Sequence, residues 1–110
     1  MRISKELLKG STSLLVLKVI SEEDSYGYEI VQRMERLSRG TFQLKEGTLY
    51  PILHTMEKEG LVEAYRKESA AGRERRYYRI TASGKVYLAA REAEWREYAA
   101  AVNAVLDGGT

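Results

Sequence analysis

The stretch Leu44-Lys45-Glu46-Gly47-Thr48-Leu49-Tyr50-Pro51 begins the segment that decides the fold. Apolar residues recur there at i, i+3, i+4 and i+7, so the spacing predicts a helix over residues 47–59 with one buried stripe. Pro51 has no backbone N–H and is tolerated only near a helix start, which places that start at Gly47 or Thr48. The stripe consists of Leu49, Ile52, Leu53 and Met56, and the other sides of the helix carry Thr48, Tyr50, Pro51, His54 and Thr55.

A second stretch, Gly72-Arg73-Glu74-Arg75-Arg76-Tyr77-Tyr78-Arg79-Ile80-Thr81, is rich in arginine. It predicts a strand over residues 75–80, preceded by a strand over residues 61–66 and a turn over residues 69–72. Alternate side chains of a strand share a face, so Arg75, Tyr77 and Arg79 oppose Arg76, Tyr78 and Ile80. We expect one of the two tyrosines to pack on the core and the basic tip to approach phosphate groups.

The segments before residue 40 predict two helices. The first covers residues 5–21 and starts at Leu7 or at Thr12, because Gly10-Ser11-Thr12 weakens its beginning. Ser25 is a suitable N-cap for the second, over residues 26–38. Gly27 in its first turn permits a close approach of another helix or of a phosphate group.

The last helix is expected over residues 83–106. It is about 36 Å long at 1.5 Å per residue, which is more than a body of three short helices needs as cover. The apolar stripe along it therefore requires a partner. That stripe contains Leu88, Trp95, Tyr98, Ala99, Val102, Val105 and Leu106.

Together these segments predict a mainly α fold with a small β-hairpin. The arrangement is a winged helix-turn-helix, residues 1–82, followed by a long C-terminal helix, residues 83–107. In this fold one helix enters a groove of DNA and a basic hairpin, the wing, lies beside it.

Composition narrows the function classes. The chain has 110 residues and no cysteine, which excludes disulfides, Cys-based zinc sites and thiol chemistry. No signal peptide or membrane-spanning segment is evident, and we expect a cytoplasmic location without membrane contact. The net charge is only +2, but residues 61–84 hold six cations against three anions. Such a local excess suits phosphate contacts.

The candidate DNA-binding residues fall in three places. The predicted third helix contributes polar and aromatic side chains for base edges, and its first turn has N–H groups that favour phosphate. The wing contributes arginines that attract phosphate. The candidates are Lys45, Gly47, Thr48, Tyr50, Pro51 and His54 on the third helix, Gly72, Arg73, Arg75, Arg76 and Tyr77 on the wing, and Tyr26 at the start of the second helix.

Interpretations without DNA binding stay open at this point. The third helix could be an ordinary surface helix, and the arginine-rich hairpin could be a solvated face. A winged-helix module that binds proteins and never DNA is the alternative function. His54 is a lone histidine, so we expect no metal site, and no catalytic triad, nucleotide loop or cofactor motif indicates an enzyme.

Four linked segments resemble the PadR family of bacterial transcriptional regulators. They are Tyr26-Gly27-Tyr28-Glu29-Ile30, residues 46–53, residues 56–62 and residues 72–81, in the order and spacing of that family. The resemblance covers the chain from about Leu14 to Gly84. It implies a winged helix-turn-helix followed by a C-terminal dimerisation helix, residues 83–107. The implied function is a homodimeric repressor on a palindromic operator in double-stranded DNA, released by a small molecule or by another signal.

The single last helix resembles the short PadR subfamily, in some members of which the dimer encloses a flat apolar pore. Trp95 lies where the pore tryptophan of those members lies. The resemblance therefore implies a planar, aromatic and often cationic effector stacked on Trp95. The equal alternative is that Trp95 only fills the dimer core, together with Leu88, Tyr98, Ala99, Val102 and Leu106.

Overall fold

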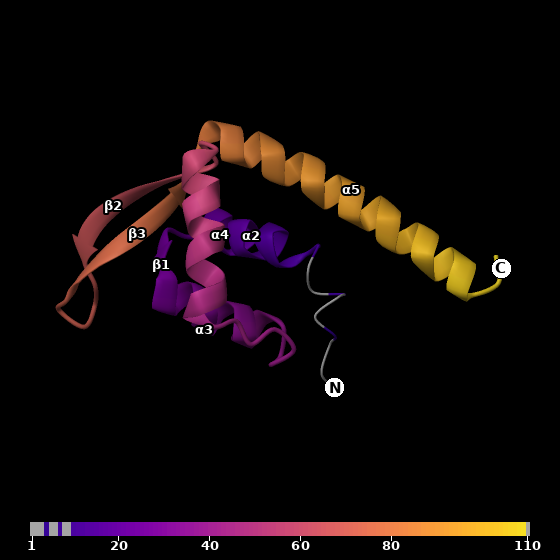
Figure 1. Ribbon diagram of the computed structural model, residues 1–110, viewed down its shortest axis with the longest axis horizontal. Helices are drawn as coiled ribbons and strands as arrows, with labels where there is room; N and C mark the ends of the chain where they lie inside the picture. The colour runs from indigo at the N-terminus through magenta and orange to yellow at the C-terminus, as the bar shows by residue number, and fades with distance from the viewer. Residues whose placement is uncertain (1–3, 5–6, 8–9, 110) are drawn as a thin grey trace.

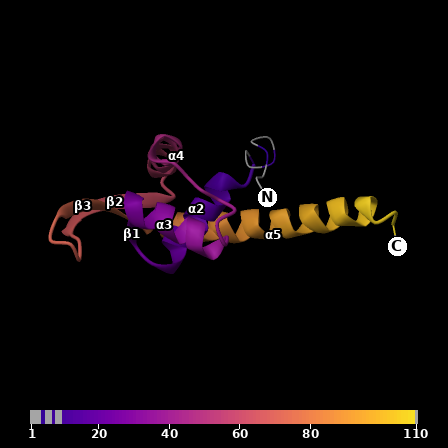
Figure 2. The same ribbon diagram turned by 90° about the horizontal axis from the view of Figure 1, so that it is seen from below.

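A helical body and a small sheet are joined to one long helix in the computed structural model, which describes residue 4, residue 7 and residues 10–109. The elements in chain order are α2 (Thr12–Glu22), β1 (Ser25–Tyr26), α3 (Gly27–Leu37), α4 (Glu46–Lys58), β2 (Val62–Glu68), β3 (Glu74–Ile80) and α5 (Ala82–Leu106). Figure 1 and Figure 2 show α2, α3, α4 and the sheet gathered at one end, with most of α5 extending away from them. This is the predicted winged helix with a long last helix.

The first helix starts at one of the two predicted residues, whereas the N-cap of the second helix differs from the prediction. α2 begins at Thr12, the later of the two predicted starts, and residues 5, 6, 8 and 9 lie outside the described part. Ser25 was expected as an N-cap, but its backbone belongs to β1, and the cap of α3 is Tyr26. Tyr26 has an extended backbone, and its N–H donates to the Glu29 carboxylate at 3.3 Å. The hydroxyl of Ser25 instead donates to the Glu23 carbonyl and accepts from Arg33.

The sheet has three antiparallel strands in the order β1-β3-β2, one more than the predicted hairpin. Ser25 of β1 lies opposite Tyr78 of β3. Across β2 and β3 the register runs from Val62 opposite Ile80 to Glu68 opposite Glu74. Because side chains alternate, the wing (residues 62–80) has two faces. We call inner the face of Arg66, Glu68, Glu74, Arg76, Tyr78 and Ile80, and outer the face of Glu63, Tyr65, Lys67, Arg75, Tyr77 and Arg79.

The core lies between α2, α3, α4 and the inner face at the base of the wing. The fully buried side chains include Leu17 and Ile20 of α2, Ile30 of α3, and Leu49 and Leu53 of α4. Tyr78, Ile80 and Leu88 complete the same apolar cluster from the sheet and from α5. Burial of these side chains is the main force that holds the three helices on the sheet.

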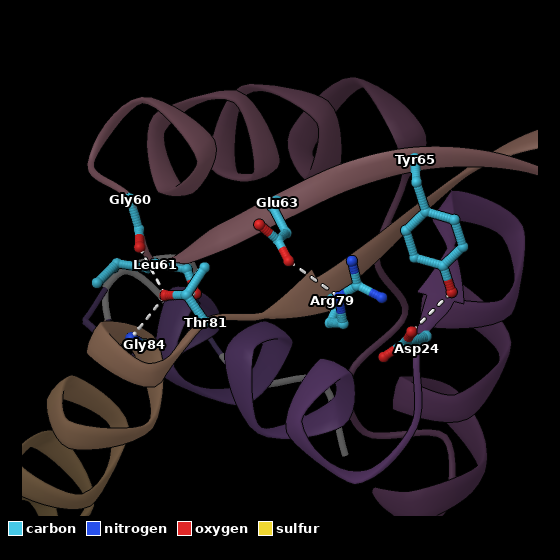
Figure 3. A network of polar contacts seen from close by, with 8 residues as sticks. All are labelled: Asp24, Gly60, Leu61, Glu63, Tyr65, Arg79, Thr81 and Gly84. Atoms are coloured by element: carbon cyan, nitrogen blue, oxygen red, sulfur yellow. Dashed lines mark hydrogen bonds and ion pairs between the residues drawn. The ribbon is translucent and has the colours of Figure 1, made fainter.

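A polar junction fixes the start of α5. The Thr81 hydroxyl donates to the Gly60 carbonyl at 2.6 Å and accepts from the Gly84 N–H at 2.9 Å, as Figure 3 shows. It therefore caps α5 and holds the end of α4 at the same time. At Gly84 a Cβ would collide with the Leu61 carbonyl oxygen and lie 2.7 Å from Ile80 Cγ1, so only glycine fits there.

The division of the chain into two parts at residue 82 stays a prediction. Gly84 and Leu88, which follow that boundary, are buried against the winged helix. The first two turns of α5 thus share one core with the preceding elements. Beyond Leu88, most of the large apolar side chains of α5 are exposed.

Candidate nucleic-acid interface

The buried and the exposed side chains of α4 lie on the sides of the helix that the sequence predicted. Leu49, Leu53 and Met56 are buried and Ile52 is half-buried. The helix begins at Glu46, one residue before the earlier expected start, so Pro51 is its sixth residue. Pro51 cannot donate to the Gly47 carbonyl, which leaves that acceptor without its helical donor. All six candidates on this segment lie on exposed positions: Lys45, Gly47, Thr48, Tyr50, Pro51 and His54.

Tyr50 connects α4 to the start of α3. Its hydroxyl end lies over Gly27, where a Cβ would be only 2.6 Å from the Tyr50 hydroxyl oxygen. Of the two expected uses of Gly27, the structure shows the close helix–helix approach. Partial burial, with the Glu46 carboxylate nearby, raises the pKa of Tyr50. The side chain is still 47% exposed, so it can both position α4 and meet a ligand.

The outer face of the wing carries a layer of tyrosines. The Tyr77 ring lies 5.3 Å from the Tyr26 ring and 5.8 Å from the Tyr65 ring, measured between centroids. One tyrosine of β3, Tyr78, packs in the core as expected, and Tyr77 is buried as well, within this layer. Tyr77 is only 5% exposed, so it supports the wing. Although the sequence made it a candidate for DNA contact, its side chain is not available for one.

Tyr65 anchors this layer to the connection between α2 and β1. Its hydroxyl donates to the Asp24 carboxylate at 2.6 Å, a contact visible in Figure 3. This hydrogen bond raises the pKa of Tyr65 to about 12, and burial acts in the same direction. Phenol-to-carboxylate hydrogen bonds are charge-assisted, so the contact fixes β2 against the body.

The wing arginines divide into paired and unpaired groups. Arg76 binds both carboxylate oxygens of Glu57 on α4, at 3.0 and 2.8 Å. Arg79 lies 3.0 Å from Glu63, as Figure 3 shows. Arg73 is exposed in the turn after Gly72, whose positive φ of +83° suits glycine. Arg75 lies over the Tyr26 ring, 5.4 Å from its centroid.

A groove of about 190 Å³ separates the wing from the starts of α3 and α4. Because the wing and α4 border one groove, a single ligand can touch both. The residues that line this groove are Tyr26, Gly27, Tyr28, Glu46, Tyr50, Glu74, Arg75 and Arg76.

On α5 the candidates separate into two groups. Leu88 belongs to the core cluster and is 7% exposed, so it is unavailable to a second chain or a ligand, contrary to expectation. Trp95, Tyr98, Val102 and Leu106 are exposed, and Ala99 is half-buried. A cavity of about 650 Å³ lies between α5, the C-terminal half of α4 and the start of α2. Its lining includes Ile52, Met56, Tyr87, Trp95 and Tyr98.

Sequence reasoning missed the partners of the basic residues. The sequence alone did not single out Glu57, Lys67 or the Tyr65–Asp24 contact. Strand alternation alone could have placed Lys67 beside Arg75, whereas the other two contacts join distant segments. Among residues 4, 7 and 10–109, no three His, Asp or Glu side chains form a group able to hold a metal ion. Within the same residues, no helix is both long and apolar enough to span a membrane.

Comparison with known proteins identifies the fold family. The model of the "Transcriptional regulator PadR-like family" matches residues 16–90. An uncharacterized protein of Lysinibacillus sphaericus is 36% identical over 96% of this chain and 97% of its own length. The transcriptional regulator Rv3488 of Mycobacterium tuberculosis is 32% identical over 76% of this chain and 75% of its own.

Solved structures agree with the sequence matches. A PadR-like transcriptional regulator from Bacillus cereus superposes with a TM-score of 0.82 at 36% identity, covering 93% of this chain and 97% of that one. A transcriptional regulator from Clostridium thermocellum has the same TM-score at 33% identity, covering 92% and 95%. With the exposed face of α4 and the adjoining basic wing, these matches show that the chain belongs to the PadR family of transcriptional regulators.

Proposed function

We propose that this regulator binds double-stranded DNA as a homodimeric repressor, with α4 in the major groove and the wing on the flanking backbone. The observation that carries the proposal is the single groove between α4 and the wing, with Tyr50 and Arg75 both in its lining. The exposed side chains near the start of α4 are in the positions that reach base edges in such folds. Tyr26 lies at the same groove and positions the start of α3.

Affinity and specificity come from different parts of this surface. The region around α4 has no excess of positive charge, whereas residues 61–84 have an excess of three cations. The wing therefore supplies the phosphate attraction, and α4 supplies sequence discrimination.

A gel-shift titration with the operator candidate upstream of the protein's own gene, against random duplex, tests this division. We expect steep weakening with salt. Tyr50→Ala should reduce binding to the cognate duplex more than to random DNA, and Arg73→Ala with Arg75→Ala should weaken both. Equal loss on the two duplexes for Tyr50→Ala would reject its role in specificity. Absence of any shift at low salt would favour a module that binds proteins.

The C-terminal helix supplies the dimer contact. Residues 89–106, the outer part of α5, expose Trp95, Tyr98, Val102 and Leu106. A second copy would cover this surface and place two α4 helices on the half-sites of a palindrome, about 34–36 Å apart. Sedimentation equilibrium tests it, because Val102→Glu with Leu106→Glu should yield a monomer with an intact winged helix. A dimer that persists in this variant would locate the interface elsewhere.

A planar aromatic effector fits the cavity beside Trp95. Its volume of about 650 Å³ lies within the range of small-molecule sites, about 300–1,000 Å³. Arg91 in the lining is paired with Glu94 at 3.1 Å, and Glu59 adds a further carboxylate, so a cationic ring system is favoured. Trp95 is the only tryptophan, so quenching of its fluorescence reports binding directly.

Calorimetry with Trp95→Ala provides the control for the effector. Loss of heat in the folded variant supports stacking on Trp95. No quenching and no heat with a panel of planar cations would leave Trp95 as a residue of the dimer core.

A further inference from the structure

The wing separates its cations by face. Arg66 lies opposite Arg76 on the inner face, and Lys67 lies opposite Arg75 on the outer face. Both are cross-strand pairs of like charge, which destabilise a sheet unless opposite charges lie nearby. The two faces differ in what lies near these like charges.

On the inner face each arginine has a carboxylate. Arg76 is held by both oxygens of Glu57 from α4, at 3.0 and 2.8 Å. Arg66 lies 3.4 Å from Glu74 of the neighbouring strand. The contact, in which Arg76 Nη2 approaches both oxygens of Glu57, also ties β3 to α4 and holds the wing beside that helix.

On the outer face the cations near the tip have no carboxylate. Among the described residues, no Asp or Glu oxygen lies within 4.0 Å of Lys67 or Arg75, whereas Arg79 nearer the base is paired with Glu63. Lys67 lies 4.7 Å from the centroid of the Tyr77 ring, and Arg75 lies over Tyr26. The Arg75 Nε is buried without a hydrogen-bond partner within the same residues.

The tyrosine layer therefore holds two like charges side by side without neutralising them. Cation–π contacts orient a cation but leave its net charge available to an anion. Arg73 extends this surface at the exposed turn, also without a carboxylate among the described residues. Arg75 lines the groove shared with Tyr50, so the surface is continuous with the exposed side of α4.

We propose that Lys67, Arg73 and Arg75 form the phosphate-binding surface of the wing, while Arg76 is a positioning residue that Glu57 holds against α4. The proposal rests on the proposed DNA binding and refines it. It adds Lys67 and removes Arg76 from the residues that contact the duplex. A DNA phosphate between Lys67 and Arg75 would supply the negative charge that the outer face lacks near the tip of the wing.

Matched neighbours in the sequence test the proposal. Lys67→Gln and Arg66→Gln each remove one positive charge, one residue apart and on opposite faces, so their long-range electrostatic effects are equal. The measurement is the slope of log K against log salt for a fixed duplex, by fluorescence anisotropy with the full-length protein. Lys67→Gln should reduce the slope by about 0.9 and the affinity roughly five- to tenfold at 0.1 M salt. Arg66→Gln should leave the slope unchanged.

The second pair separates contact from positioning. Arg75→Gln should lower the slope as Lys67→Gln does, whereas Arg76→Glu should weaken binding through loss of the α4 contact. Adding Glu57→Arg to Arg76→Glu reverses the ion pair and should recover affinity with the wild-type slope. A phosphate-contacting Arg76 could not be rescued in this way.

Three results would overturn the proposal. Equal slope changes for Arg66→Gln and Lys67→Gln would remove the distinction between faces. An unchanged slope for Lys67→Gln would exclude Lys67 from the contact, and failure of the reversed pair would return Arg76 to it. In each case wild-type binding to DNA would still stand. Absence of wild-type binding to any duplex at low salt would instead reject the proposed function together with this refinement.

Discussion

Leu53 and Leu106 are the same side chain in two helices of this molecule, yet Leu53 is fully buried and Leu106 is 76% exposed. Leu53 lies in α4 within the apolar cluster that joins α2, α3, the sheet and the start of α5. Leu106 ends the outer part of α5, where Val105 is exposed as well. The winged helix thus buries most of its large apolar side chains within itself, whereas the outer part of α5 leaves its own exposed. Stability and assembly can therefore be perturbed separately.

The largest expected effect comes from Leu53→Ala. Removing a fully buried leucine forfeits its transfer free energy and leaves a cavity, so the free energy of unfolding should fall by about 2–5 kcal/mol. Urea denaturation measures the loss. Leu106→Ala is the matched control, and at concentrations where the protein is monomeric it should change the same quantity by less than about 0.5 kcal/mol. Similar losses would contradict the contrast between the two regions.

Gly84→Ala should give the next largest effect. The new Cβ would collide with the Leu61 carbonyl oxygen and lie close to Ile80, so the start of α5 would have to shift. We expect a loss of about 1–3 kcal/mol by urea denaturation. Gly47→Ala is the control, since a Cβ added there would have open space within 4 Å and α4 is helical at that position. That change should stabilise by about 0.5–1 kcal/mol.

Tyr65→Phe tests how much the contact between the wing and the body of the winged helix contributes to stability. It removes the hydrogen bond to Asp24 and leaves that carboxylate with water, at a cost of about 0.5–1.5 kcal/mol. Thermal unfolding measures the change. Asp24→Asn should give a loss of the same order and should add little in the double variant, because both remove one contact. Additive losses would show that the two groups stabilise the fold independently.

The same contact predicts a dependence on alkaline pH. The pKa of folded Tyr65 is raised to about 12 from an ordinary value of 10.0, because its hydroxyl donates to Asp24. The contribution is therefore complete below pH 10 and is lost as the pH rises through 12. The difference in stability between wild type and Tyr65→Phe should shrink across that window. A difference that stays constant up to pH 12 would exclude the contact as its source.

Glu92→Gln should have the smallest effect on stability. It tests the contact between α5 and Lys18 of α2. Glu92 accepts from Arg96 at 3.0 Å and lies 3.9 Å from Lys18 of α2. The Arg96 contact, with Lys18 nearby, lowers the pKa of Glu92, so its contribution is present above the ordinary carboxyl pKa and lost as pH falls through the lowered value. Exposed ion pairs are screened by salt, so the Tm difference should be small and confined to low salt. A large difference at high salt would indicate tighter packing of α5 on α2.

Local periodicity explains which parts of the fold were predictable. The stripe of Leu49, Leu53 and Met56 follows from helical spacing alone, and so does the alternation that places Tyr77 and Tyr78 on opposite faces. The burial of Tyr77 did not follow, because its cover comes from Tyr26, which belongs to a strand of only two residues. Strands that short have no periodicity to detect.

The candidate site was predictable in its elements but not in its pairings. The exposed side of α4 and the basic wing were both evident from the sequence. The Arg76–Glu57 contact joins residues 19 apart, and Leu88 is buried in the core cluster where α5 packs on α2. Such outcomes depend on tertiary packing, which overrides any assignment from neighbouring residues. A run of arginines therefore predicts positive charge on a hairpin without telling which arginines remain available.

The Thr81 hydroxyl, which bonds both Gly60 and Gly84, gives α5 the properties of a lever arm. One side chain joins Gly60, just after the C-cap of α4, to the first turn of α5, and the close packing of Gly84 restricts movement there. Beyond Leu88, where α5 leaves the core, the arm to Leu106 is about 27 Å long, so a tilt of about 5° displaces its far end by about 2 Å. In the other direction, a displacement at the far end of α5 becomes a small rotation applied directly to the end of α4.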